Sequence, residues 1–448
     1  MRAPSVSSVR ERGDSDRRLV MSIWAKWMVR RVTVLAANAF VCAWNGLSAL
    51  QVNKCCLCSV LALDIAGAMR VFRWFWKCSR DRGGNVPTVP VYRYRSHNEY
   101  NARKSKGRSF VPVNCSMADL ERYSLDNGHF EGHVVTSKEG QLFYRSIPRF
   151  ALDPDWVRKR FLATDDYRYA EASYKGAVSF YLGMIGARLV FDKFLNGTKA
   201  NCQLLHAGDS KHFNLQGVSG KRKPDYVAID DQGDPYALVE AKGTSGARVG
   251  NDRVRDAKGQ LMLASVTTLT AAGQPLCVRT GHELEKHVVA SSFTGGVTSK
   301  GSSWKLCDVD PEDAGEGELT IQLDGAIYAH YMPMVQRLSR NGVRCESVNN
   351  VDCDLVRIGE GVSVGLVRGL RDVIADRGNM GVGFGDQGSN ARERNDDGCF
   401  RRVSEFFHSI EGFQGLIEDE KVSMGGDGVV VVLGDEYVRS LPEVDRAL

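Results

Sequence analysis

Two acidic residues and a lysine in the middle of the chain are spaced so that a short hairpin would bring them together. The runs Pro224–Ile229 and Tyr236–Ala241 are apolar enough to predict two strands, and a polar Asp-Gln-Gly-Asp turn separates them. Asp225 stands near the start of the first run, and Glu240 and Lys242 stand at the end of the second. Residues of these types can hold a cation and stabilise a developing negative charge.

The pairing of the two predicted strands decides which side chains meet. With a turn centred between Gln232 and Gly233, three pairs of residues lie opposite each other: Asp225 with Glu240, Val227 with Leu238, and Ile229 with Tyr236. Cross-strand partners lie about 5 Å apart at their Cβ atoms and point to the same face. Side chains alternate along a strand, so Lys242 shares a face with Glu240. We therefore expect two carboxylates and one lysine to converge at one end of a short sheet.

The expected cluster suits hydrolysis of a phosphodiester. Two close carboxylates repel each other unless a cation lies between them. Their hard oxygens suit Mg²⁺ or Mn²⁺, and the backbone carbonyl of Ala241 could add another oxygen. A metal ion placed there can activate water and neutralise the charge that develops on a phosphodiester. Lys242 would stabilise that charge or orient the attacking water.

This stretch resembles the motif of the PD-(D/E)xK nuclease superfamily, which has the restriction-endonuclease-like fold. The motif stands here as Pro224-Asp225, a gap of 14 residues, and then Glu240-Ala241-Lys242. The resemblance implies an α/β fold with a mixed sheet flanked by helices. It also implies cleavage of phosphodiester bonds, usually in DNA, with a divalent metal. The resemblance covers about 150 residues, a third of the chain.

The resemblance also assigns roles to single residues. It implies that Asp225 and Glu240 bind the metal and that Lys242 assists catalysis. An acidic residue on the preceding helix completes the metal site in many relatives, and Glu171 is the matching residue here. A glutamine on the following helix lies near the substrate in many relatives, and Gln260 matches it.

Elements around the hairpin are predicted to complete one α/β unit over residues 161–310. The apolar spacing predicts a helix over 165–186, a strand over 187–194, a helix over 251–268 that begins at the N-cap Asn251, and a strand over 286–293. The order is therefore helix, three strands, helix and strand. Residues 109–160 predict a small α/β lead-in to this unit.

The last part of the chain, 311–448, is acidic and rich in glycine, and we expect it to form an extra α+β region. The pattern predicts helices near 326–338, 363–375 and 400–410 and a strand over Val429–Leu433. Its composition suits contact with a protein partner better than contact with phosphate.

Basic residues surround the motif and are candidates for binding nucleic acid, with DNA favoured over RNA. The candidates beside Gln260 are Lys223, Arg253, Arg255 and Lys258. Lysine and arginine hold phosphates without reading sequence, and Arg255 and Lys258 are spaced to share one helical face. The alternative is a solvated charged surface.

Three alternatives to an active nuclease stay open. The first is a catalytically silent module of the same fold that binds nucleic acid or a protein. In the second, Asp225 only caps a strand and Glu240 and Lys242 form a surface ion pair, so that the hairpin is a coincidence. The third is a membrane-anchored or exported protein whose nuclease domain faces outward.

The net charge of +5 is distributed unevenly, because the first quarter of the chain is basic and the rest is acidic. Residues 1–108 carry 20 Lys+Arg and 6 Asp+Glu, and the remaining 340 residues carry 39 and 48. The uncharged run Val32–Asn53 is long enough to span a membrane, and it is also compatible with a secretion signal or with translation upstream of a true start at Met69 or Met117. We expect 1–108 to be a poorly structured segment whose part 79–110 is a basic, tyrosine-containing linker.

The remaining composition points to an ordinary globular protein. Hydrophobic residues make up 43% and charged residues 25% of the chain, which excludes a wholly disordered or fibrous protein. The 12 cysteines follow no paired framework, so we expect a reducing, cytoplasmic and bacterial-type setting. The sequence thus predicts a cytoplasmic, Mg²⁺-dependent nuclease acting on DNA.

Overall fold

The structure is a computed structural model of the chain, and the described residues all belong to the second of its two units, Gly83–Leu448. It describes residues 86–102, 110–126, 129–130, 133–134, 138–195, 202–208, 211–217, 223–310, 315–340, 342–359, 361–375, 398–410, 417–418 and 420–440. The predictions for 1–85, including the run Val32–Asn53, lie outside the described residues. Among the helices that are described, none is long and apolar enough to cross a membrane.

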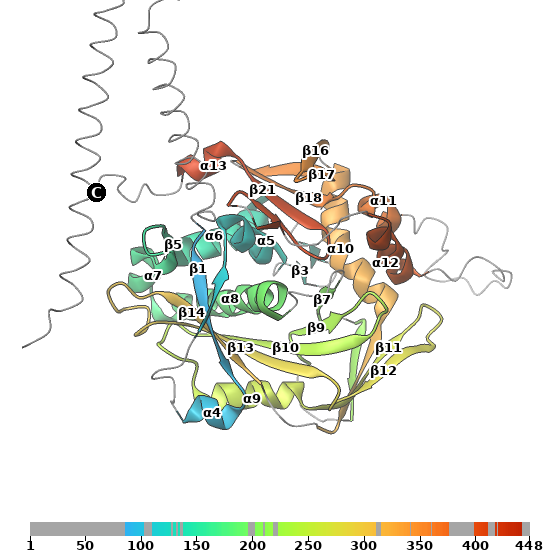
Figure 1. Ribbon diagram of the computed structural model, residues 1–448, viewed down its shortest axis with the longest axis horizontal. Helices are drawn as coiled ribbons and strands as arrows, with labels where there is room; N and C mark the ends of the chain where they lie inside the picture. Colours follow the sequence, from blue (N-terminus) through green and yellow to red (C-terminus); the bar gives the residue numbers. More distant parts are fainter. Residues whose placement is uncertain are drawn as a thin grey trace, which may run out of the picture. The chain divides into compact units, whose positions relative to one another are not determined.

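A nine-stranded mixed sheet lies at the centre of the second unit. Its order is β5-β6-β1-β14-β13-β10-β9-β7, with β2 paired to β1. The strands are β1 (Thr88–Tyr94), β2 (Val111–Asn114), β5 (Leu152–Asp155), β6 (Arg160–Ala163), β7 (Gln203–His206), β9 (Tyr226–Ile229), β10 (Pro235–Gly243), β13 (Glu285–Phe293) and β14 (Trp304–Val309). β10 runs parallel to β13, and β1 runs parallel to β14 and β6, while the other pairs are antiparallel. The fold is mixed α/β, with a large curled sheet flanked by helices (Figure 1).

The turn between β9 and β10 is built from residues that suit a tight reversal. The Asp230 carboxylate accepts hydrogen bonds from the backbone N–H groups of Gln232 and Asp234, both at 2.9 Å. Gly233 has a φ of +82°, a left-handed conformation that glycine adopts without steric cost. These contacts reverse the chain over a few residues and fix the register of the hairpin.

The register agrees with the prediction in the middle of the hairpin and differs from it beside the turn. Val227 pairs with Leu238 as expected, but Ile229 pairs with Pro235 instead of Tyr236. A β-bulge at Tyr236 causes the difference, because it places one residue in β10 that has no partner in β9. The bulge lies near the turn, so the end of the hairpin that carries the acidic residues keeps the predicted register.

Two helices cover opposite faces of this part of the sheet (Figure 1). α8 (Ala172–Val190) packs on one face of β10 and β13, and its backbone approaches β10 so closely that a Cβ on Gly243 would lie 1.7 Å from the Ser179 carbonyl oxygen. α9 (Asn251–Leu261) packs on the other face, where it buries Val254, Ala257 and Leu261. The predicted hairpin strands, the helix after them and the strand over 286–293 are therefore present as β9, β10, α9 and β13. The first of the three predicted strands, 187–194, is helical, and β7, β8, β11 and β12 are strands that were not predicted.

The helix before the hairpin begins later and ends later than predicted. The expected helix 165–186 is two helices, α7 (Asp165–Tyr169) and α8, and the expected strand 187–194 continues α8 into a π-helical turn, Phe191–Leu195. Residues 182–191 are buried on all sides, so the run lacks the alternation of apolar and polar residues that marks an amphipathic helix. That apolar run was therefore mistaken for a strand.

The helix after the hairpin is shorter than predicted. α9 ends at Leu261 and its N-cap is Gly250, not Asn251. Residues Leu263–Leu269 form the strand β11 instead of continuing the helix to 268. The β-branched sequence Val266-Thr267-Thr268 favours a strand, and β11 is paired on both sides.

A four-stranded sheet crosses the predicted domain boundary at residue 310. Its order is β12-β11-β15-β8, with β8 (Phe213–Gln216), β12 (Pro275–Thr280) and β15 (Gly317–Gln322). β15 belongs to the predicted C-terminal region, yet it pairs in parallel with β11 of the predicted nuclease unit. Cutting the chain at 310 would therefore remove an internal strand of this sheet.

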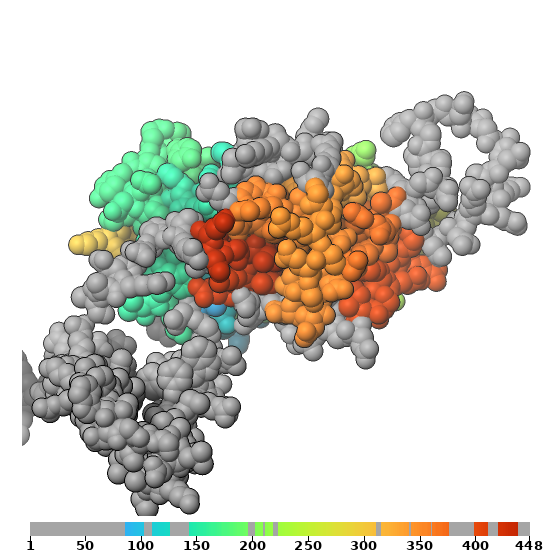
Figure 2. All heavy atoms as spheres, turned by 90° about the horizontal axis from the view of Figure 1, so that it is seen from above, coloured from blue at the N-terminus to red at the C-terminus, as the bar shows by residue number. Residues whose placement is uncertain are grey.

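A six-stranded antiparallel sheet and four helices make up the rest of the described C-terminal region. The strands are β16 (Arg344–Val348), β17 (Val351–Gly359), β18 (Val362–Val367), β21 (Val429–Leu433), β20 (Val422–Met424) and β19 (Ile417–Glu418), in sheet order. The helices are α10 (Leu323–Arg340), α11 (Leu370–Ala375), α12 (Cys399–Ser409) and α13 (Asp435–Ser440). The predictions of α10, α12 and β21 are confirmed, whereas 363–375 is β18 followed by α11. Figure 2 shows these orange and red elements forming one continuous surface.

A buried network of charged side chains joins the C-terminal region to the central sheet and its helices. Arg122 lies on α5 (Met117–Asp126) and forms ion pairs with Asp192 at 2.5 Å and with Asp427 at 3.8 Å. Arg188 of α8 approaches the other oxygen of Asp427 at 4.0 Å. Asp427 lies in the turn between β20 and β21, so the region 311–448 packs as part of the same unit and not as a separate domain.

The segment expected to be a linker contributes a strand and a helix to the fold. β1 lies inside the nine-stranded sheet, and α4 (His97–Asn101) follows it. Tyr94 and Tyr100 are 5% and 1% exposed, so they belong to the core. Burial alternates at the start of β1, where Val89 and Val91 are buried. The basic and polar residues around them make this two-residue period hard to recognise in the sequence. The expected lead-in 109–160 contains β2, α5, α6 (Lys138–Ala151), β5 and the start of β6, together with β3 (His129–Phe130) and β4 (His133–Val134).

Candidate active site

The hairpin brings Asp225, Glu240 and Lys242 together, as the spacing predicts. The carboxylate of Glu240 accepts a hydrogen bond from the backbone N–H of Asp225 at 3.0 Å. The carboxylate of Asp225 in turn accepts one from the backbone N–H of Ala241 at 2.8 Å. The ammonium of Lys242 donates to the second oxygen of Glu240. Each acidic side chain is therefore held by the strand opposite its own, and the lysine closes the cluster.

The cluster lies on the α9 face of the sheet. A Cβ on Gly243 would point at Ser179 of α8, so the odd-numbered residues at this end of β10 face α8. Side chains alternate along a strand, which places Glu240 and Lys242 on the opposite face. Figure 1 shows α9 packed along that face of β10 and β13.

Burial makes the two carboxylates costly to ionise together. Glu240 is 1% exposed, and the side chain of Lys242 is 18% exposed. Burial raises the pKa of Asp225 and of Glu240, and the negative charge of Asp225 raises the pKa of Glu240 further. The positive charge of Lys242 lowers both pKa values and only partly offsets burial. A cation placed at the two carboxylates would favour their charged forms.

Glu171 lies apart from these residues. It is the N-cap of α8, where it is exposed and its carboxylate accepts a hydrogen bond from the Ser173 backbone N–H at 3.4 Å. α8 passes Gly243 near Ser179 and then runs back along β10, so that Arg188 lies 5.2 Å from the ring of Tyr226. Glu171 therefore lies two helical turns beyond the end of β10. In the part of the chain that is described, no group of three His, Cys, Asp or Glu side chains is placed to hold a metal ion.

The four candidate residues on α9 divide between two sides of the helix. At about 100° per residue, Arg255 and Lys258 lie on one side of the buried stripe, and Arg253 and Gln260 lie on the other. Arg255 is already paired with Asp252 at 2.7 Å, and both of these side chains are exposed. Lys223 is half-buried two residues before Asp225. The basic residues thus surround the hairpin without forming a single cluster.

Two features that support the site were not predicted from the sequence. The first is the backbone contact between Gly243 and α8, which leaves no room for a side chain directly after Lys242. The second is α4, because the Tyr100 hydroxyl donates to the Val249 carbonyl at 2.8 Å and the Arg248 guanidinium lies 3.7 Å from the centre of the Tyr100 ring. These contacts hold the loop that leads from β10 to α9. A glycine after the Glu-x-Lys sequence was the only signal of either support.

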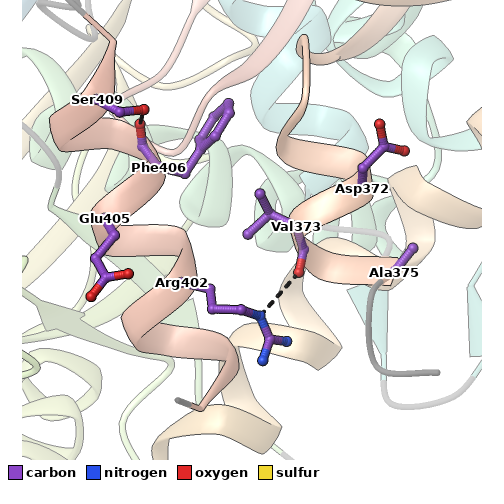
Figure 3. A pocket seen from close by; sticks show the side chains of 7 residues that line it. All are labelled: Asp372, Val373, Ala375, Arg402, Glu405, Phe406 and Ser409. Carbon is purple, nitrogen blue, oxygen red and sulfur yellow. Dashed lines mark hydrogen bonds between the residues drawn. The ribbon is translucent and has the colours of Figure 1, made fainter. Parts of the chain in front are cut away.

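A separate hollow lies between α11 and α12 (Figure 3). Its volume is about 770 Å³, and it is lined by Asp372, Val373, Ala375, Arg402, Glu405, Phe406 and Ser409. The Arg402 guanidinium donates to the Val373 carbonyl at 3.4 Å, while Asp372 and Glu405 pair with neighbouring arginines. The hollow contains no residue of the hairpin cluster, so the candidate site remains at β9 and β10.

No family model matches the chain, and neither a curated protein nor a solved structure matches it. The arrangement of the hairpin residues is therefore the observation on which a functional proposal must stand.

Proposed function

We propose that the chain is a divalent-metal-dependent nuclease that hydrolyses phosphodiester bonds in DNA. The observation that carries the proposal is the cluster of Asp225, Glu240 and Lys242. A buried and a half-buried carboxylate share one face of a hairpin beside a partly exposed lysine, although a turn separates Asp225 from the other two residues in the sequence. The succession of α8, β7, β9, β10, α9 and β13 supports a restriction-endonuclease-like fold.

The donor set fits a hard divalent cation such as Mg²⁺ or Mn²⁺. Asp225 and Glu240 supply carboxylate oxygens, and burial, which Lys242 only partly offsets, raises the pKa of each. When bound, such an ion activates water and neutralises charge on a phosphodiester. Lys242 would keep its ammonium group beside the scissile phosphate, where it stabilises the developing negative charge. Arg253, Arg255, Lys258, Lys223 and Gln260 would contact the DNA backbone around the site.

The proposal is tested with plasmid DNA and the full-length chain. We expect cleavage in Mg²⁺ or Mn²⁺ and none in a chelator. Asp225→Asn and Lys242→Met should each lower the cleavage rate by about 100-fold or more. Glu346→Gln removes an exposed carboxylate from β16 in the six-stranded sheet and should leave the rate unchanged. Thermal unfolding checks that each variant is folded. Cleavage by both site variants at the rate of the parent would contradict the proposal.

A catalytically silent binding module is the second candidate. The direct contact between Lys242 and Glu240 favours it, because the lysine neutralises one carboxylate without a metal. In this case the parent binds DNA or a protein but cleaves no DNA in any divalent metal. Lys242→Met would then alter stability and leave binding unchanged.

A further inference from the structure

The turn that joins β5 to β6 presents a basic and apolar tip to solvent. We call residues 156–160 the β5–β6 tip. Val157 is 88% exposed, the side chain of Arg158 is 67% exposed, and Lys159 is also exposed. Arg160 follows with a side chain that is 33% exposed. The three basic residues of the tip outnumber the neighbouring carboxylates, Asp153 and Asp155.

The backbone of Lys159 shows that the tip retains a lysine at a position that suits glycine. Lys159 has a φ of +49°, and the only other described non-glycine residues with positive φ are Asn349 and Asn350. Asparagine enters this conformation readily, whereas a lysine there carries a steric cost. The Thr88 N–H and hydroxyl both donate to the Lys159 carbonyl at 2.9 Å, which holds the conformation. A charged side chain kept at such a position suggests a use for the charge.

The tip lies at the same end of the nine-stranded sheet as the candidate active site. β1 runs antiparallel to β10, as follows from the registers Lys242 with Ala290, Ala290 with Cys307, and Cys307 with Tyr92. The beginning of β1, where Thr88 pairs with Arg160, is therefore at the end where β10 finishes. β6 is four strand spacings from β10, about 19 Å across the sheet, and Thr88 lies four residues beyond Tyr92, about 13 Å further along the strand. The two offsets together place Arg160 about 23 Å from Lys242 along the sheet, the length of about seven nucleotides at about 3.4 Å each.

We propose that the β5–β6 tip is a second contact for the DNA substrate of the proposed nuclease. Arg158 and Lys159 bind backbone phosphates, and Val157 makes an apolar contact with sugars or base edges in a groove. Asp155 orients Arg158, since its carboxylate accepts from the Arg158 backbone N–H at 2.9 Å and lies 3.4 Å from the guanidinium. This inference rests on the proposed function and adds a contact about 23 Å from the hydrolytic site.

Duplex DNA fits the tip better than a lipid surface does. Stable attachment to a membrane takes two anchoring signals, and one exposed valine supplies little apolar area. The phosphates of DNA need only charges at a suitable spacing, which Arg158 and Lys159 supply in addition to the basic residues of α9. Binding to anionic vesicles is accordingly the competing result in the test.

The test measures binding of a fluorescent duplex of about 30 base pairs to the full-length chain in a chelator, over a series of salt concentrations. Arg158→Ala and Lys159→Gly should each weaken binding by about 3- to 10-fold and lower the slope of log K against log salt by about 0.9. Val157→Ser should weaken binding without changing the slope. The matched controls lie in the six-stranded sheet and its turn: Arg344→Ala removes an exposed charge, and Asn350→Gly relieves the same backbone conformation. Both controls should bind like the parent.

Lys159→Gly distinguishes a loss of DNA binding from a loss of stability. Glycine adopts the left-handed conformation freely, so this variant should unfold at the same temperature as the parent or higher while it binds DNA more weakly. If the tip variants bind like the parent, the inference is overturned, and loss of cleavage in Asp225→Asn would still support the nuclease. If the parent itself binds no duplex at low salt, the tip contact and DNA as the substrate both fail. If the tip variants lose only co-sedimentation with phosphatidylserine vesicles, the tip is a membrane contact.

Discussion

A buried histidine lies one strand away from the candidate site and on the opposite face of the sheet. His287 of β13 pairs with Val239 of β10, and its side chain is 2% exposed. Its Nδ1 lies 3.0 Å from the Asp308 carboxylate, and its Nε2 lies 3.5 Å from the Glu285 carboxylate. Burial by itself lowers the pKa of His287, but the two carboxylates raise it to about 9. His287 is therefore charged in the folded protein at neutral pH.

The histidine should make stability depend on pH in a defined direction. A folded pKa of about 9 against about 6.5 in the unfolded chain stabilises the fold below pH 6.5, and this stabilisation is lost as the pH rises to about 9. The contribution is on the order of 3 kcal/mol. Urea unfolding at about pH 6 and about pH 10 should show this loss in the parent.

His287→Gln tests the origin of that loss. The variant should be less stable than the parent at pH 6 and should show a flatter dependence on pH, because no charge at this position is lost. His282→Gln changes an exposed histidine and should keep the full dependence. An unchanged slope in His287→Gln would show that other groups cause the loss.

The single residues that could be predicted from the sequence are those whose positions follow from strand pairing. Asp225, Glu240 and Lys242 are fixed by the alternation and register of one hairpin, which are local properties of the chain. Glu171 could not be placed in this way, because its position depends on where α8 begins and on how α8 crosses the sheet. The pairing of His287 with Asp308 joins two strands and has no local signal at all.

At the level of elements, the close approach of α8 to β10 holds the end of the strand that carries Lys242. Gly243 and Gly183 face each other at this contact, and a Cβ on Gly183 would lie 2.9 Å from the Gly243 nitrogen. Both glycines are required by the approach of two backbones rather than by a positive φ. The contact makes the hairpin and the helix a single rigid support.

Gly243→Ala should therefore destabilise the protein. The new Cβ would lie 1.7 Å from the Ser179 carbonyl oxygen, so helix and strand must separate, and we expect a loss of about 1 to 3 kcal/mol. Gly259→Ala is the matched control, because it lies in α9 with no atom within 4 Å of the added Cβ. Greater helix propensity should stabilise that variant by up to about 1 kcal/mol. Chemical denaturation of both variants measures the difference, and equal stabilities would contradict the contact.

Elements were predicted well where turn residues bound an apolar run or a helical period is clean, and poorly where one element continues directly into the next. The strands β9 and β13 are buried almost throughout, and they were found as short apolar runs, as was β10. The helices α10 and α12 were found from their helical periods. The end of α8 is buried on every side and reads equally well as a strand. β11 follows α9 with a single residue between them, so the change from the helical to the strand spacing of apolar residues has no turn to mark it.

Across the whole molecule, the strand β1 connects the beginning of the described chain to its middle. It is paired with β2, β6 and β14, and the helix α4 after it holds the loop between β10 and α9. These pairings join distant residues, such as Val91 and Leu306, so composition could not reveal them. The same holds for β15 and for the Arg122–Asp427 ion pair, which unite regions that the sequence divided at residue 310.

The two start sites considered from the sequence therefore predict different behaviour. A chain that begins at Met69 keeps β1, α4 and β2, and it should unfold cooperatively at a temperature close to that of the full-length chain. A chain that begins at Met117 lacks these three elements, which leaves one side of β14 unpaired and the β10–α9 loop unsupported. We expect it to aggregate or to unfold without a cooperative transition. A cooperative transition at the parent temperature would contradict the role of β1.

The pairing of β1 with β14 also bears on how the protein is made. More than 200 residues separate Val91 from Leu306, so a ribosome that adds about 5 to 20 residues per second needs about 10 to 40 s to pass from one strand to the other. During that time β1 has emerged without its parallel partner, and its apolar side chains are open to other nascent chains. We therefore expect the yield of folded protein in cells to depend on chaperones and on slow synthesis at low temperature.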